Sequence, residues 1–148
     1  MSTIWILVAN QAEAQVYSAS RLPGSLAPVY SLVHEEGKAH ARDLVSDAPG
    51  RVHDRMGSGR HSMEADTGVK EEARRRFAKE IVTRLKSDYL KANFDRLVVL
   101  AAPGVLGVIR KTLTGDLEKA VIKEISKDVA GQDIFRIQEQ LKRSFELK

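Results

Sequence analysis

Two continuous apolar runs provide the framework of this chain. Residues 4–9 read Ile-Trp-Ile-Leu-Val-Ala and residues 96–102 read Arg-Leu-Val-Val-Leu-Ala-Ala, and each run predicts a buried strand. Between them the hydrophobic period changes to four, which is typical of one face of an amphipathic helix. The residues that carry this period are Val69, Ala73, Phe77, Ile81 and Leu85. The chain is therefore expected to combine a sheet with helices.

The first third of the chain predicts two further strands. Residues 13–18 alternate in polarity, and residues 28–35 resume a strand pattern after the break Arg-Leu-Pro-Gly-Ser. Three strands joined by short links favour an antiparallel meander. A long polar segment at about 36–66 follows, and Asp66 or Thr67 can cap the start of the helix that ends near Lys91.

The second half alternates between helix and strand. Pro103-Gly104 opens a short helix, residues 121–126 form a weaker strand, and residues 133–147 form a last amphipathic helix. Such alternation implies parallel strands with crossover helices, so the sheet should be mixed. We expect an α/β fold of the ribonuclease H-like class, with a three-layer mixed sheet of about five strands and flanking helices.

Composition places the chain in a broad class. Its 148 residues suit a single domain spanning 1–148, and no cysteine is present to form a disulfide or a thiolate metal site. The net charge of +4 at pH 7 favours polyanionic partners without requiring them. No signal-peptide pattern or long apolar run occurs, so we expect a cytoplasmic protein without direct membrane insertion.

The sequence gives little support for a metal-dependent nuclease, a zinc site or a serine hydrolase. The two apolar runs contain no carboxylate, whereas a nuclease of this class needs acidic metal ligands at strand ends. The histidines match no zinc-ligand spacing, and Gly57-Ser58-Gly59 departs from the G-x-S-x-G pattern of hydrolases. We therefore expect no metal site and no cofactor. The histidines are His34, His40, His53 and His61.

The segment 46–64, SDAPGRVHDRMGSGRHSME, is the strongest candidate for a binding site. Its glycines allow backbone N–H groups to converge on an anion, and its arginines carry planar charged forks that suit phosphate. The predicted RNA- or anion-binding residues are Arg51, Arg55, Gly57, Ser58, Gly59, Arg60 and His61. The alternative is a mobile surface loop, because acidic residues around it nearly balance its charge.

The same stretch carries a family resemblance. Ser46-Asp-Ala-Pro-Gly-Arg, Gly57-Ser-Gly-Arg-His and Arg76-Phe-Ala-Lys-Glu resemble the bacterial host attachment proteins, described as required for attachment to host cells. That family is similar to domain 2 of archaeal and eukaryotic class 1 release factors. The resemblance covers nearly the whole chain and implies a release-factor-like order of elements, with the segment 46–64 in the place of the loop that reaches the ribosome. The Gly-Gly-Gln motif of that loop is absent here.

Three functional hypotheses follow. The first is an RNA- or ribosome-associated factor that uses the segment 46–64. The second is a non-enzymatic interaction protein that serves attachment through a host-surface or protein partner. The third is a hydrolase that acts on an ester such as peptidyl-tRNA, with His61 positioning a water molecule.

Overall fold

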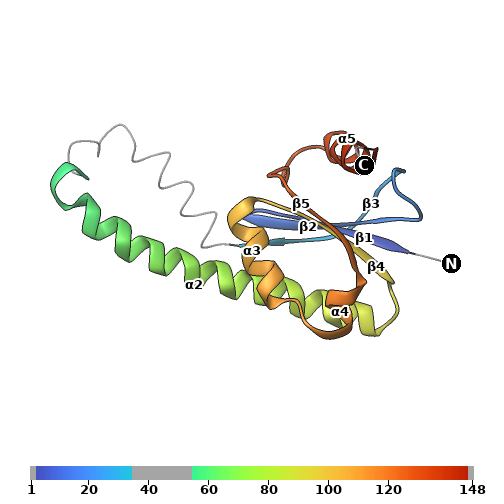
Figure 1. The fold of residues 1–148 in the computed structure, drawn as a ribbon, viewed down its shortest axis with the longest axis horizontal. Helices are drawn as coiled ribbons and strands as arrows, with labels where there is room; N and C mark the ends of the chain where they lie inside the picture. Colours follow the sequence, from blue (N-terminus) through green and yellow to red (C-terminus); the bar gives the residue numbers. More distant parts are fainter. Residues whose placement is uncertain (1–2, 35–54, 147–148) are drawn as a thin grey trace.

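The computed structural model describes residues 3–34 and 55–146, with side chains described at 3–34 and 71–145. In chain order the elements are β1 (Ile4–Ala9), β2 (Glu13–Ala19), β3 (Ala27–Val33), α2 (Arg55–Leu90), β4 (Arg96–Ala101), α3 (Pro103–Thr112), α4 (Gly115–Ala120), β5 (Val121–Ser126) and α5 (Ile134–Glu146). Helix α2 is much the longest of these and extends well past the sheet (Figure 1).

The described strands form one five-stranded sheet in the order β3-β2-β1-β4-β5. Strand β1 lies at its centre, antiparallel to β2 and parallel to β4, with Leu7 beside both Val16 and Val99. Strand β5 continues the parallel half, and β3 continues the antiparallel half. The continuous apolar sequences of β1 and β4 follow from this placement, because each central strand is covered on both faces.

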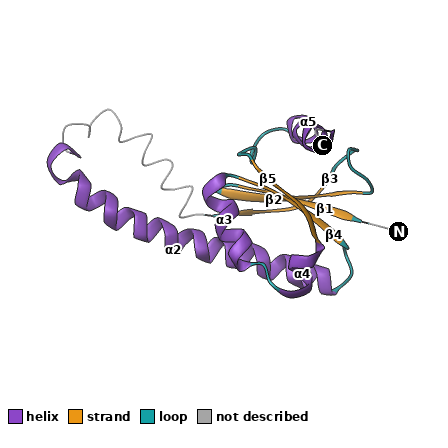
Figure 2. Ribbon diagram, viewed as in Figure 1, coloured by secondary structure: helices purple, strands orange, loops and turns teal. Residues whose placement is uncertain are grey.

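Helices cover the two faces of the sheet unequally. Helices α2, α3 and α4 pack on one face, where Leu7, Ile81 and Ile109 belong to the larger buried cluster. Of the described helices, only α5 packs on the opposite face, where Ile6 and Ile137 belong to the second cluster. Figure 2 shows α5 and the other helices on opposite sides of the strands. The expected α/β architecture, a mixed five-stranded sheet with flanking helices, is confirmed, and it is compatible with the ribonuclease H-like class.

Most element boundaries agree with the sequence predictions to within one or two residues, and one helix was not predicted. Helix α4 spans only six residues between Thr114 and Val121. It buries Leu117 and Ala120, and Gly115 adopts a positive φ of 63° at its start. A segment this short shows no clear helical period, because little more than one turn is available.

The predicted start of α2 was wrong. The sequence predicted a helix from about Asp66 and a polar loop at about 36–66, but the backbone is helical from Arg55. The apolar period begins only at Val69, and the backbone of the preceding turns projects beyond the sheet (Figure 1). Adding turns to an existing helix also avoids the cost of nucleation, which offsets a penalty of about 1 kcal/mol for each glycine. The rest of the predicted loop, residues 36–54, lies outside the described residues.

Candidate functional site

The predicted anion-binding residues fall where side chains are not described. Arg51 lies outside the described residues, and the backbone of the others belongs to the first two turns of α2. Those residues are Arg55, Gly57, Ser58, Gly59, Arg60 and His61. Their placement on a helix replaces the glycine-flexed loop that the sequence predicted. Their role in binding stays a prediction.

The carboxyl ends of the parallel strands carry polar side chains that serve the fold. Asn10, directly after β1, accepts hydrogen bonds on Oδ1 from the backbone N–H groups of Ala12 (2.8 Å) and Glu13 (2.9 Å). Its Nδ2 donates to Asp128 Oδ1 at 3.2 Å. Asn10 thus closes the β1–β2 turn and ties it to the segment after β5. In the described part of the chain, no group of three or more histidines, aspartates or glutamates lies close enough together to hold a metal ion.

His34 is held in one orientation at the end of β3. Its Nδ1 lies 2.6 Å from the carbonyl oxygen of Gln11, so a proton on Nδ1 would be donated to that carbonyl. Its ring stacks on Phe77 of α2, with centroids 4.6 Å apart and planes at 10°. His34 therefore joins β3 to α2. His40 and His53 lie outside the described residues, and the side chain of His61 is not described.

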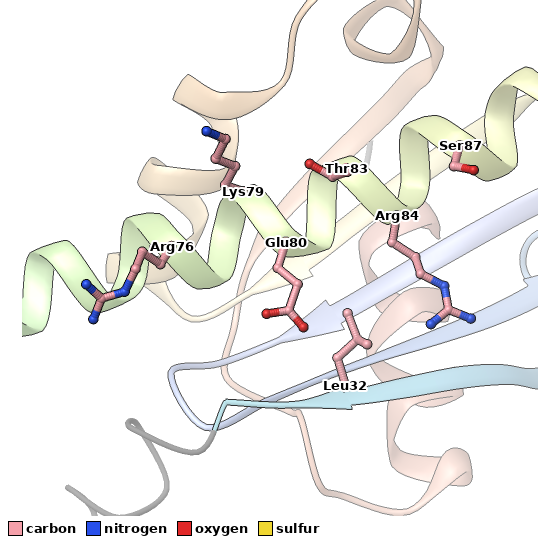
Figure 3. Close-up of a pocket in the computed structure, with 7 residues that line it drawn as sticks. All are labelled: Leu32, Arg76, Lys79, Glu80, Thr83, Arg84 and Ser87. Carbon is pink, nitrogen blue, oxygen red and sulfur yellow. The ribbon is translucent and has the colours of Figure 1, made fainter.

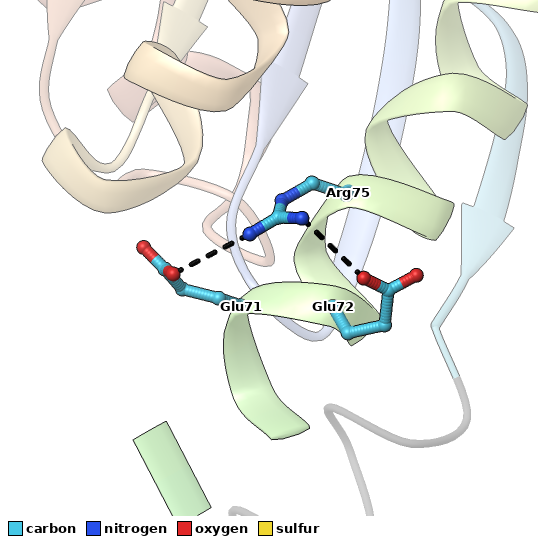
Figure 4. A network of polar contacts seen from close by, with 3 residues as sticks. All are labelled: Glu71, Glu72 and Arg75. Carbon is cyan, nitrogen blue, oxygen red and sulfur yellow. Dashed lines mark hydrogen bonds and ion pairs between the residues drawn. The ribbon is translucent and has the colours of Figure 1, made fainter. Parts of the chain in front are cut away.

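The arginines of α2 have different surroundings. Arg75 lies between two carboxylates, 3.5 Å from Glu71 and 3.4 Å from Glu72 (Figure 4). Glu71 and Arg75 have the i,i+4 spacing of a helix ion pair, and this pair is present. Glu80 and Arg84 have the same spacing but form no ion pair among the described residues; the Arg84 guanidinium lies instead over the Tyr30 ring, 3.9 Å from its centroid.

A groove of about 530 Å³ opens between α2 and the edge strand β3. Its lining combines three cations, one carboxylate, two hydroxyls and one apolar side chain: Arg76, Lys79, Glu80, Thr83, Arg84, Ser87 and Leu32. Figure 3 shows the Glu80 and Arg84 side chains extending toward Leu32, whereas Lys79 extends away from β3. Positions 80 and 84 share this side of α2 because residues four apart lie one above the other on a helix.

The Tyr30 ring, which the Arg84 guanidinium covers, belongs to an aromatic cluster. Its ring meets Trp5 edge-on at 6.0 Å, and Trp5 in turn stacks on Phe94 at 4.6 Å. Burial, and then the charge of Asp88, raise the pKa of the Tyr30 hydroxyl, while Arg84 opposes this effect. Among the described residues neither the Tyr30 hydroxyl nor Asp88 Oδ2 has a hydrogen-bond partner. The Arg84 guanidinium that lines the groove is therefore held over a cluster of aromatic rings.

Sequence reasoning did not find this groove. Glu80 and Arg84 have the i,i+4 spacing of a helix ion pair, and that local signal pointed to the wrong contact. The contact between Arg84 and Tyr30 joins residues far apart in the chain, and no periodic pattern encodes it. The alternating polarity of residues 28–35 predicted a strand, but it did not show that this strand lies at the sheet edge beside α2.

None of the described helices combines the length and hydropathy that crossing a bilayer requires. A curated relative from Rickettsia prowazekii (strain Madrid E), an uncharacterized protein, is 30% identical over 73 residues, which are 48% of this chain and 49% of that protein. The chain thus spans about half the length of this relative. A solved structure described as an archaeal protein matches 96% of this chain and 36% of its own length, with 11% identity and a TM-score of 0.44.

A family-level match extends over nearly the whole sequence. The family described as "Protein required for attachment to host cells" matches residues 5–141, from the second residue of β1 to the buried Leu141 of α5. This range includes all five described strands apart from Ile4, and the two elements that line the groove, α2 and β3. The chain therefore belongs to the family of proteins required for attachment to host cells.

Proposed function

We propose that this protein binds RNA through the basic residues of α2, including the predicted residues Arg55, Arg60 and His61. The main support is the position of the first half of α2, whose backbone projects beyond the sheet (Figure 1). The net charge of +4 adds a general attraction to polyanions. Arg51, Gly57, Ser58 and Gly59 complete the proposed contact set.

The described turns of α2 extend this basic surface. Between 71 and 90 the helix carries six cations and four carboxylates: Arg74, Arg75, Arg76, Lys79, Arg84 and Lys86, with Glu71, Glu72, Glu80 and Asp88. Glu71 and Glu72 are both engaged by Arg75. Lys79 and Lys86 are exposed, and Lys79 extends away from the sheet (Figure 3). They are suited to the contacts with phosphates that dominate affinity for RNA.

Fluorescence anisotropy with a labelled twelve-nucleotide oligouridine tests this proposal. Affinity should fall as salt rises, with a slope of log K against log salt of about −0.7 for each phosphate that the protein neutralises. The double variant Arg55→Glu, Arg60→Glu should bind at least about tenfold more weakly, with a shallower slope. The matched control is Lys119→Glu, Lys142→Glu, which reverses two exposed cations on α4 and α5.

Co-sedimentation with ribosomes at low salt extends the test to the expected cellular partner. The wild-type protein should pellet with ribosomes, and the Arg55→Glu, Arg60→Glu variant should stay in the supernatant. If the wild-type protein binds neither oligouridine nor ribosomes at low salt, the proposal is wrong. Equal binding by the helix variant and the control variant would place the contact away from α2.

A second candidate function is favoured by the family description, namely a protein contact that serves attachment to host cells. In this case a host-surface or other protein would be the partner, and RNA would have no role. Two measurements separate the candidates. Recovery of the native protein outside the bacterium, together with a surface protein that co-purifies with it after washing at high salt, would favour attachment over RNA binding.

A further inference from the structure

Strand β3 presents an unpaired edge in the described part of the sheet. It is first in the strand order, with β2 as its single described neighbour. His34 donates its backbone N–H to Ala12 at 2.8 Å, and the register pairs Leu32 with Ala14. Because hydrogen bonding alternates along an antiparallel pair, Leu32 and Tyr30 also bond toward β2. The N–H and C=O groups of Ser31 and Val33 therefore point outward.

The available edge is short and well delimited. Pro28 has no N–H, and the register shifts in this part of the β2–β3 pair, where Val29 is the unpaired extra residue. These features protect the first half of β3 from pairing with another strand. From Tyr30 to Val33 the strand is regular, and the described residues supply no second strand beside it.

The groove lies beside this same stretch. Tyr30 and Leu32 pack on the α2 face of the sheet, so an added strand would turn the residues opposite them toward α2 as well. Alternate residues of a strand repeat at about 6.7 Å. Residues four apart on a helix repeat at about 6 Å. Two alternate side chains of an added strand can thus face Glu80 and Arg84 in turn.

The direction of an added strand follows from the contacts between β3 and α2. Arg84 covers Tyr30, and His34 at the end of β3 stacks on Phe77. The two elements therefore run in opposite directions, and a strand antiparallel to β3 runs in the same direction as α2. It would pass Glu80 beside Leu32 first (Figure 3), and two residues later it would pass Arg84, which covers Tyr30.

We propose that the edge of β3 binds an extended segment of a partner protein as an added antiparallel strand, with a Lys-x-Glu sequence facing α2. The lysine lies against the Glu80 carboxylate and the glutamate against the Arg84 guanidinium. The central residue exchanges backbone hydrogen bonds with Ser31. Backbone pairing supplies affinity and the two charges supply register, as in other cases of strand addition to a sheet edge. The RNA contacts proposed above use the N-terminal turns of α2 with Lys79 and Lys86, whereas this contact uses Glu80 and Arg84, whose side chains extend toward Leu32 (Figure 3).

A labelled peptide, fluorescein-Gly-Thr-Lys-Val-Glu-Thr-amide, is the probe. Its controls are the same peptide with lysine and glutamate exchanged, and the same peptide with N-methylvaline at the centre, which removes the backbone donor to Ser31. Anisotropy should rise on addition of the full-length protein with the first peptide. Each control should bind about tenfold more weakly, which corresponds to about 1.4 kcal/mol. Oligouridine should not displace the peptide.

Two protein variants locate the contact. The charge-reversed variant Glu80→Lys, Arg84→Glu should invert the preference, so that the exchanged peptide binds about tenfold more tightly than the original. Val33→Pro removes one outward N–H without touching the bonds to β2, and Val33→Thr is its matched control. The proline variant should lose binding and the threonine variant should keep it. Circular dichroism establishes that each variant is folded.

In a ¹⁵N–¹H spectrum, the bound peptide should slow hydrogen exchange at the amides of Ser31 and Val33 more than at those of Tyr30 and Leu32. Several results would overturn the proposal: no binding of any peptide, equal binding of all three, or no change of preference in the charge-reversed variant. Displacement of the peptide by oligouridine would assign the groove to nucleic acid. Concentration-dependent dimerisation that is lost in Val33→Pro would show a second copy of the chain at this edge.

Discussion

Truncation of Leu85 to alanine measures how firmly α2 is fixed to the sheet. Leu85 is 0% exposed and belongs to the same buried cluster as Trp5 and Leu7 of β1. Replacing a fully buried leucine by alanine removes its burial and leaves a cavity, with a typical cost of about 2.7–5 kcal/mol. Helix α2 lies against one face of a rigid sheet and has limited freedom to collapse into the gap. We expect a loss of about 3 kcal/mol in the free energy of unfolding.

Urea denaturation followed by circular dichroism is the assay. With a slope of about 2 kcal/mol per molar urea, the midpoint should fall by about 1.5 M. A loss of this size corresponds to a Tm lowered by about 6–12 °C for a chain of this length. The control Lys86→Ala changes the exposed neighbour and should stay within about 0.5 kcal/mol of wild type. If Leu85→Ala cost less than about 1 kcal/mol, α2 would not be packed on the sheet as described.

Other substitutions test the surroundings of α2. The double variant Gly57→Ala, Gly59→Ala should increase helical circular dichroism at 222 nm, because alanine is favoured over glycine by about 1 kcal/mol inside a helix; reduced helicity would show that this segment is not helical. Tyr30→Phe should stabilise the protein slightly, since a buried hydroxyl without a partner is removed. The raised pKa of Tyr30 means that the folded state holds its proton more tightly than the unfolded chain, so the free energy of unfolding declines above about pH 10. Urea titrations at several alkaline pH values should show a smaller decline in Tyr30→Phe than in wild type. Arg75→Ala should cost at most about 0.5 kcal/mol at low salt and less at high salt, because both of its ion pairs are exposed, and a larger loss in the same urea assay would contradict this assignment.

The sheet could be predicted from the sequence because its signals are local. The apolar run at 4–9 specifies a covered central strand, and the alternation of helix and strand after residue 96 specifies the parallel half. The pairing of β1 with β2 agrees with the expected antiparallel meander, whereas the parallel pairing of β1 with β4 was not predicted. Family-specific motifs pointed to the host attachment family, and the match over residues 5–141 confirmed it.

The beginning of α2 could not be predicted in the same way. Periodicity detects a helix only where one face is buried, and the turns from Arg55 to about Val69 precede the part that packs on the sheet. Glycine and serine in that segment are ordinary loop signals, and here they belong to a helical extension. The groove was missed for a different reason, because its defining contact between Arg84 and Tyr30 depends on tertiary packing.

The central claim is that α2 is one continuous helix that carries the predicted binding residues away from the sheet. The chain has no cysteine, so the variant Ser58→Cys, Thr83→Cys can be spin-labelled at those two positions alone. The distance between the labels, measured by pulsed electron spin resonance, tests the claim directly. A continuous helix places these positions about 38 Å apart and gives a narrow distribution. A broad distribution, or a maximum well below about 30 Å, would contradict the claim.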